Sequence, residues 1–220
     1  MRGALLLGAC LIGVLAAAPV RAQQPLDDPR LSAVRGSIAA ALADAEREGL
    51  PSEWLLAKVR EGLSKRVPPP RIAAAVGQLL SRMRDADAMV APVAPERGPQ
   101  RRQLLRAAVD ALNVGAPSAG LGQLVREASP RGAAHVREVL VAVAELGERG
   151  FGAPAAVEAV REARRGAGVA PLIERARRLG PSGRDDALRE TGRELGRGRG
   201  LDHPGRGRDH DSHGPPGRTR

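Results

Sequence analysis

The chain has 220 residues and a formal net charge of +10, and 33 of its 35 basic residues are arginine. It contains one Cys (Cys10), one Trp, one Phe and no Tyr. This composition excludes a disulfide framework and a cysteine-based zinc site, as well as a nucleic-acid reader that stacks bases on aromatic side chains. No nucleic acid is therefore expected among the partners.

The first 22 residues have the three parts of a secretory signal peptide. Arg2 provides a short positive segment, and Ala4–Ala18 form an apolar run. Val20-Arg21-Ala22 then offers small residues at the two positions that a signal peptidase reads. We therefore expect residues 1–22 to be removed and the protein to be exported, either to the periplasm or out of the cell.

Two other fates of this segment stay open. The first is an uncleaved membrane anchor, although the apolar run is shorter than the roughly 20 residues that a spanning helix needs. The second follows from Leu7-Gly8-Ala9-Cys10, which resembles the bacterial lipobox, in which the cysteine is lipidated. More apolar sequence follows Cys10 than a lipobox has, so we predict cleavage after Ala22, which would leave a mature chain without cysteine.

Residues 30–195 have the composition and periodicity of helices. Ala, Leu, Arg and Glu dominate, and apolar residues recur at steps of three and four. Gly or Pro breaks occur at 49–51, 68–70, 115–117 and 150–154. Glycine suits the left-handed end of one helix and proline the first turn of the next. The prediction is an all-α protein, in which Ser52 and Ser118 are placed to be helix N-caps.

The breaks share a register that indicates a repeat. When the chain is aligned on Gly49, Gly115 and Gly150, a branched apolar residue lies eleven positions before each glycine. A Val-Arg-Glu tripeptide begins ten positions after each glycine. The apolar residues are Ile38, Leu104 and Val139, and the tripeptides begin at Val59, Val125 and Val160. A further copy at 136–138 is out of register, so the prediction rests on the shared offset.

Ile72 and Val169 extend this series to five starts, at steps of 34, 32, 35 and 30 residues. That length suits two helices of about 12 residues with their turns. We expect an array of about four helix-turn-helix units; the alternative is an irregular bundle whose breaks imitate a period. Three prolines crowd residues 91–100, which we predict to be a linker between helical groups at 23–90 and 101–191.

Residues 192–220 differ from the rest of the chain. They are rich in Gly, Arg and Pro and offer too little apolar surface to fold, so we expect a disordered tail. Histidine and aspartate gather here in a pattern typical of a weak site for Zn²⁺, Ni²⁺ or Cu²⁺, although an incidental solvated tail is the alternative. The candidate metal ligands are His203, Asp209, His210, Asp211 and His213.

The sequence offers no recognisable catalytic pair. His135 is the one histidine outside the tail, and no partner for it can be named. Asp27-Asp28 and Asp185-Asp186 precede helical sequence, where acids favour the positive helix N-terminus. Gly147–Gly152 is glycine-rich but lacks the Lys-Ser/Thr of a phosphate loop. We therefore expect neither an enzyme nor a resident cofactor.

Two classes of function remain. The first is a non-enzymatic scaffold of the bacterial envelope that binds an unidentified partner protein through a face of the helical array. The second is an envelope protein whose tail contacts anionic polymers, lipid headgroups or, weakly, transition metals. Residues 23–191 hold 26 basic against 21 acidic side chains that alternate like solvated helix faces, which favours the first class.

Overall fold

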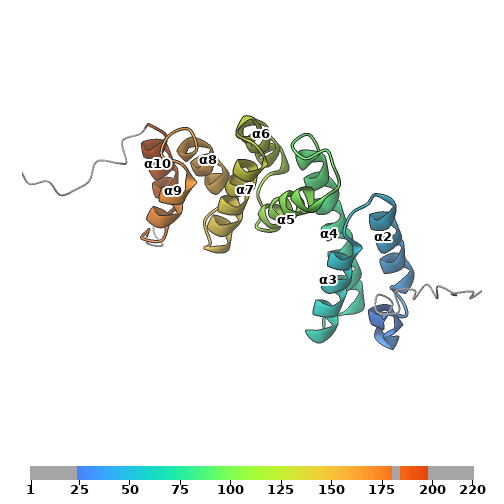
Figure 1. Ribbon diagram of the computed structural model, residues 1–220. Helices are drawn as coiled ribbons and strands as arrows, with labels where there is room; N and C mark the ends of the chain where they lie inside the picture. Colours follow the sequence, from blue (N-terminus) through green and yellow to red (C-terminus); the bar gives the residue numbers. More distant parts are fainter. Residues whose placement is uncertain (1–23, 180–183, 198–220) are drawn as a thin grey trace, which may run out of the picture. The chain divides into compact units, whose positions relative to one another are not determined.

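A computed structural model describes residues 24–179 and 184–197. In this part of the chain there are nine α-helices, three 3-10 helices and no strand, so the all-α prediction is confirmed (Figure 1). The chain divides into two compact units between Arg84 and Asp85. This division falls inside helix α4 (Pro69–Val90), whereas the predicted linker is residues 91–100. The predicted signal peptide, residues 1–22, lies outside the described residues.

The N-terminal unit packs its helices around an aliphatic core. Ile38 and Leu42 are buried on one face of α2, and Ile72 and Val76 are buried on α4. Gly62 of α3 lies so close to α4 that a Cβ there would be 2.7 Å from Ile72 Cγ1. The elements are η1 (Gln24–Asp27), η2 (Pro29–Leu31), α2 (Arg35–Arg47), α3 (Ser52–Ser64) and α4 (Pro69–Val90) as far as Arg84.

Ion pairs position the helix ends in this unit. Arg84 Nε donates to Glu48 Oε2 at 2.8 Å, which links α4 to the end of α2 and lowers the pKa of Glu48. Lys65 and Lys58 donate to the Glu61 carboxylate and hold its pKa at about 2. Because solvent screens these exposed pairs, each adds little to the stability of the unit.

The C-terminal unit arranges its helices in two rows (Figure 1). Helix α5 packs along α7, which contacts α9, while α6 packs on α8 and α8 on α10. Alternate helices along the chain are therefore neighbours, in the rows α5–α7–α9 and α6–α8–α10. The elements after α4 are α5 (Pro99–Asn113), α6 (Ser118–Ala128), η3 (Ser129–Arg131), α7 (Ala133–Glu148), α8 (Ala153–Ala163), α9 (Val169–Ala176) and α10 (Arg184–Gly196).

Helices α8 and α10 pack backbone against backbone. A Cβ on Gly192 would lie 2.7 Å from both the Cα and the carbonyl oxygen of Ala159, and a Cβ on Gly166 would overlap the Leu195 carbonyl oxygen. The amide of Ala167 donates to that same carbonyl oxygen at 3.0 Å. Glycine is required at both positions because a side chain would push the two backbones apart.

The predicted start of the tail, Gly192, lies inside helix α10. Helix α10 continues to Gly196, and Leu195 is fully buried. The glycines that suggested disorder in the sequence permit the close approach of α8 instead. The rest of the predicted tail, residues 198–220, lies outside the described residues, so its disorder stays a prediction.

The Pro-rich stretch predicted as a linker is a fixed connection within the C-terminal unit. Helix α4 ends at Val90 and α5 begins at Pro99, inside the predicted range 91–100. Arg101 Nη2 lies 2.7 Å from Asp87 Oδ2, and Nη1 donates to the carbonyls of Ala94 and Pro95 at 3.2 Å each. The Arg101 side chain is only 11% exposed, so this one residue fastens the connection to the end of α4.

The three glycines that set the predicted register all adopt a positive φ: 67° at Gly49, 88° at Gly115 and 83° at Gly150. The amide after each glycine donates to the carbonyl five residues earlier, for example Ala116 to Ala111, which is the Schellman arrangement of a helix end. The predicted glycine caps are therefore confirmed, although the repeat itself stays a prediction.

Two other helix ends differ from the sequence analysis. Arg66, at a φ of 54°, ends α3 in the same left-handed way, and no glycine marked this cap in the sequence. The N-caps predicted at Ser52 and Ser118 are wrong, because both serines are the first residues of their helices. The prolines before them occupy the N-cap positions, without a side-chain hydrogen bond.

Replacing Gly115 by alanine is expected to lower the free energy of unfolding by about 1 kcal/mol. A Cβ at this position has no atom within 4 Å, so the cost is backbone strain rather than a clash. Gly115→Asn should cost less, because asparagine tolerates the left-handed region better than alanine. Thermal unfolding followed by circular dichroism measures both, and equal melting temperatures for the two variants and the parent would contradict the expectation.

Candidate functional site

The predicted metal ligands are not part of the described structure. His203, Asp209, His210, Asp211 and His213 all lie outside the described residues, so their use as ligands stays a prediction. Within residues 24–179 and 184–197, no group of three or more His, Cys, Asp or Glu side chains is placed to hold a metal ion.

His135 on α7 has a partner that the sequence analysis missed. Its Nδ1 lies 3.0 Å from Glu138 Oε2, one helical turn further along. The signal was the spacing of three residues, which places two side chains on the same helix face. The His135 side chain is 14% exposed, and its Nε2 is buried without a hydrogen-bond partner.

The paired acids singled out in the sequence lie at helix starts, as expected. Asp28 Oδ1 accepts a hydrogen bond from the Arg30 amide at 2.9 Å and caps η2. Asp185 belongs to α10, but its Oδ1 accepts from the Gly152 amide at 2.9 Å, at the N-terminus of α8. This carboxylate therefore caps a neighbouring helix rather than its own.

The glycine-rich segment Gly147–Gly152 spans the last two residues of α7 and the turn that leads to α8. Arg184 of α10 covers it, with its Cζ 4.3 Å from the centre of the Phe151 ring. Arg184 Nη2 also donates to the Arg149 carbonyl at 2.9 Å. A cation over an aromatic face is attracted to it, so this segment joins α10 to the helix pair before it.

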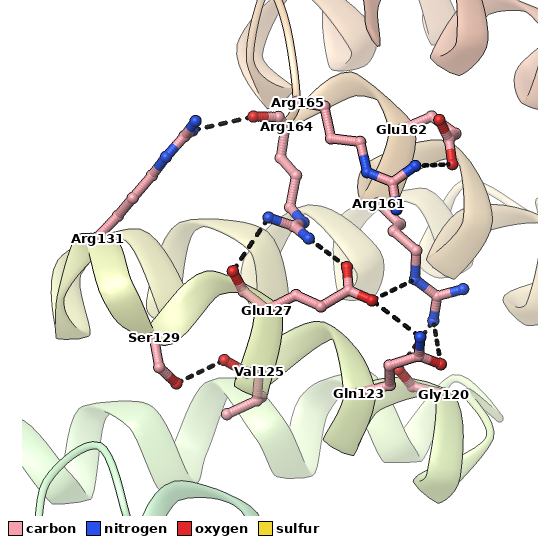
Figure 2. A network of polar contacts seen from close by, with 10 residues as sticks. All are labelled: Gly120, Gln123, Val125, Glu127, Ser129, Arg131, Arg161, Glu162, Arg164 and Arg165. Atoms are coloured by element: carbon pink, nitrogen blue, oxygen red, sulfur yellow. Dashed lines mark hydrogen bonds and ion pairs between the residues drawn. The ribbon is translucent and has the colours of Figure 1, made fainter.

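A network of charged side chains joins α6 to α8 (Figure 2). Glu127 Oε2 pairs with Arg164 Nη2, and Glu127 Oε1 lies 3.7 Å from Arg161 Nε. Gln123 Nε2 donates to Glu127 Oε1 at 2.9 Å. Burial of Glu127 raises its pKa, but hydrogen bonds from Arg164 and Gln123 outweigh this effect and leave the pKa below its ordinary value.

This network links two copies of the Val-Arg-Glu tripeptide. Glu127 ends the copy in α6, and Arg161 is the central residue of the copy in α8. The side chains of Glu127 and Arg164 are only 23% and 10% exposed. Because Glu127 pairs with both arginines between two packed helices, these contacts hold α6 and α8 in register.

A groove of about 530 Å³ runs between α7 and α9. Its floor is apolar and includes Val141, Ala142, Ala170 and Ile173. Val141 is 48% exposed, and among the described residues no other large apolar side chain is classed as exposed. The groove thus leaves aliphatic surface open to solvent.

A smaller hollow of about 120 Å³ lies beside this groove, between α5 and α7. Gln103 and Leu104 of α5 line it. Ala134 and Arg137 of α7 line both hollows. The two therefore open on the same face of the C-terminal unit, along the row α5–α7–α9.

Charges of both signs line the rim of the groove. Glu145 Oε1 lies 2.7 Å from Arg149 Nη2 and 3.6 Å from Arg177 Nη2, so its charge is balanced within the protein. Arg177 also pairs with Glu174 of α9. Arg137 instead donates to a neutral amide, Gln103 Oε1, at 3.4 Å. The guanidinium of Arg137 on the rim therefore contacts a neutral group and not a carboxylate.

This groove was not predicted from the sequence, although a signal was present. Residues 139–144 are six consecutive apolar residues inside one helix. A helix buries only part of its circumference against a core, so a continuous run of this kind leaves at least one apolar side chain exposed. In the structure that side chain is Val141.

No family model, no curated protein and no solved structure matches this chain. Among the helices that the structure describes, none is both long and apolar enough to cross a membrane. The apolar run Ala4–Ala18 is outside these helices.

Proposed function

We propose that the protein is an exported, non-enzymatic helical-repeat scaffold of the bacterial envelope, and that it binds a partner protein in the groove between α7 and α9. The observation that carries this proposal is Val141, a half-exposed aliphatic side chain on the floor of a groove with a charged rim. Apolar surface bordered by polar groups is typical of protein-binding sites. The envelope location rests on the predicted signal peptide, residues 1–22.

Equivalent positions in the C-terminal unit support a repeat of helix pairs. Gly115 and Gly150, 35 residues apart, end α5 and α7 with φ of 88° and 83°. Gly132 and Gly168, 36 residues apart, precede α7 and α9, and both have a φ of 89°. Each repeat would then be one pair: α5–α6, α7–α8 and α9–α10. Stacked pairs of this kind commonly present one row of helices to a partner.

The ion pairs favour a protein partner over an anionic polymer. Many arginines of the C-terminal unit lie within 4 Å of a carboxylate of the same unit, and their charges are therefore partly neutralised. Examples are Arg101, Arg149, Arg161, Arg164, Arg177, Arg189 and Arg193. Binding of a polyanion requires unneutralised cations and weakens steeply as salt is added.

A photo-reactive amino acid at position 141 of the full chain tests the proposal. In periplasmic extract we expect irradiation to yield a discrete cross-linked product with one other protein. The yield should change little when the salt concentration rises to about 0.5 M, because an apolar contact is not screened. Mass spectrometry identifies the product.

The matched control carries the same group at Asp186 of α10, whose side chain is 89% exposed and does not line the groove. We expect no discrete product from this position. The same products from both positions, or none from position 141, would contradict the proposed groove. Loss of the product at high salt would favour the polyanion alternative.

A further inference from the structure

We propose that residues 198–220 of this same chain occupy the groove between α7 and α9, with Leu201 on its apolar floor. The consequence for binding rests on the proposed function, because a partner would then compete with this C-terminal segment for Val141 and its neighbours. Three observations carry the proposal: where α10 ends, how far the next residues reach, and what side chains they bring.

The described chain ends beside the groove. The Leu195 carbonyl of α10 accepts a hydrogen bond from the Ala167 amide at 3.0 Å. Gly168 follows as the N-cap of α9, and the next two residues, Val169 and Ala170, line the groove. Residues 198–220 therefore continue the chain from a point close to the N-terminal end of α9.

The segment is long enough to enter the groove. Leu201 follows Gly196 by five residues, which can span up to ~16 Å when extended. Ile173 lies about one turn into α9, so roughly 6 Å along the helix axis separate it from Val169.

The side chains near the start of the segment match the groove. Leu201 is the single large apolar residue between 198 and 220. Arg199 and Asp202 flank it with charges of opposite sign. The groove presents Val141 and Ile173 on its floor, with Arg137 and three glutamates on its rim. With Leu201 on the apolar floor, Arg199 has the rim glutamates as counter-charges and Asp202 has Arg137.

Paired cysteines in the full chain test this placement. With Cys10→Ser as background, the variant Val141→Cys/Leu201→Cys should form an intramolecular disulfide under mild oxidation. The control pair is Arg165→Cys/Leu201→Cys, because Arg165 is 51% exposed and adjoins Gly166, which packs against the end of α10. A segment that is only tethered would react faster with the nearer cysteine at 165, whereas a docked segment reacts faster with the one at 141.

A second measurement uses the single cysteine of Val141→Cys in the same background. Docking should protect this thiol from alkylation, and Leu201→Asp in the full chain should speed its alkylation about tenfold, as expected when a buried leucine is lost. Thr219→Asp, a charge change near the end of the chain, should leave the rate unchanged.

The outcomes are distinct. Faster reaction at position 165 together with unchanged alkylation in Leu201→Asp would overturn the proposal. A disulfide-linked dimer of Val141→Cys/Leu201→Cys would also overturn it, by assigning the groove to a second copy of the chain. A partner cross-linked from position 141 without an internal disulfide would keep the proposed function and reject this inference. An internal disulfide without a cross-linked partner would keep this inference and reject the proposed function.

Discussion

Replacing Glu127 by glutamine is expected to lower the free energy of unfolding by about 2 kcal/mol, because it leaves two partly buried guanidinium groups without their counter-charge. Arg164 and Arg161 are 10% and 21% exposed, and both pair with this carboxylate. The Glu127 carbonyl still accepts from Arg164 Nη1 at 3.1 Å in the variant, which limits the loss. Thermal unfolding, together with hydrogen exchange of peptides from α6 and α8, measures the effect.

Glu162→Gln is the matched control for Glu127→Gln. Glu162 is the equivalent glutamate of the next Val-Arg-Glu copy, and its partner Arg165 is 51% exposed. Glu162→Gln should therefore cost less than about 0.5 kcal/mol, as exposed pairs do. Adding Arg164→Met to Glu127→Gln should cost less than the sum of the two single changes, because it removes a stranded charge. Equal losses for Glu127→Gln and Glu162→Gln would contradict a buried network.

The same carboxylate should make stability depend on pH. Hydrogen bonds lower the pKa of Glu127 in the folded protein, so the unfolded state binds a proton more readily. The stabilisation is complete above the unfolded pKa, about 4.3 for glutamate, and is lost as the pH falls through the lower folded pKa. Glu61, whose folded pKa is about 2, acts in the same direction. The difference in melting temperature between parent and Glu127→Gln isolates Glu127 and should shrink in acid.

The helical architecture could be predicted because it depends on local sequence. Apolar spacing placed the buried residues Ile38, Leu104 and Val139 correctly, and glycine at 115 and 150 marked real helix ends. These features follow from the period of a helix and from the freedom of glycine at positive φ. They need no knowledge of which helices meet.

Features that depend on tertiary contacts could not be predicted in this way. Gly192 reads as a disorder-promoting residue until Ala159 is placed against it. Arg101 reads as one of many arginines until the turn at 91–98 folds onto it. In each case the residue that explains the position comes from another segment of the chain, and composition alone does not reveal it.

The candidate groove was missed for a related reason. Val141 became notable only when α9 was placed beside α7 and left it half exposed. Asp185, which the sequence placed at a helix N-terminus, does cap a helix in the structure, although the helix is α8 and not its own. A short polar motif is therefore a weaker guide in this protein than an excess of apolar residues on one helix.

Replacing Gly192 by alanine is expected to lower the free energy of unfolding by about 2 kcal/mol, which is the cost of overpacking less the higher helix propensity of alanine. The added Cβ would lie 2.7 Å from both Ala159 Cα and its carbonyl oxygen. Backbone atoms cannot rotate away as the end of a side chain can, so α10 must shift as a whole. Leu195, which is fully buried one turn later, would shift with it.

Gly122→Ala in α6 is the matched control for this change. It is also a glycine inside a helix of the C-terminal unit, but its Cβ would lie 3.5 Å from Arg126 Nη1 and 3.9 Å from Met89 Cγ, which are ordinary contacts. Helix propensity should then dominate and raise the free energy of unfolding by up to about 1 kcal/mol. The two Gly→Ala changes should therefore shift the melting temperature in opposite directions. A stabilised Gly192→Ala variant would mean that α8 and α10 are not in backbone contact, and that the chain after Thr191 is the separate tail that its composition suggests.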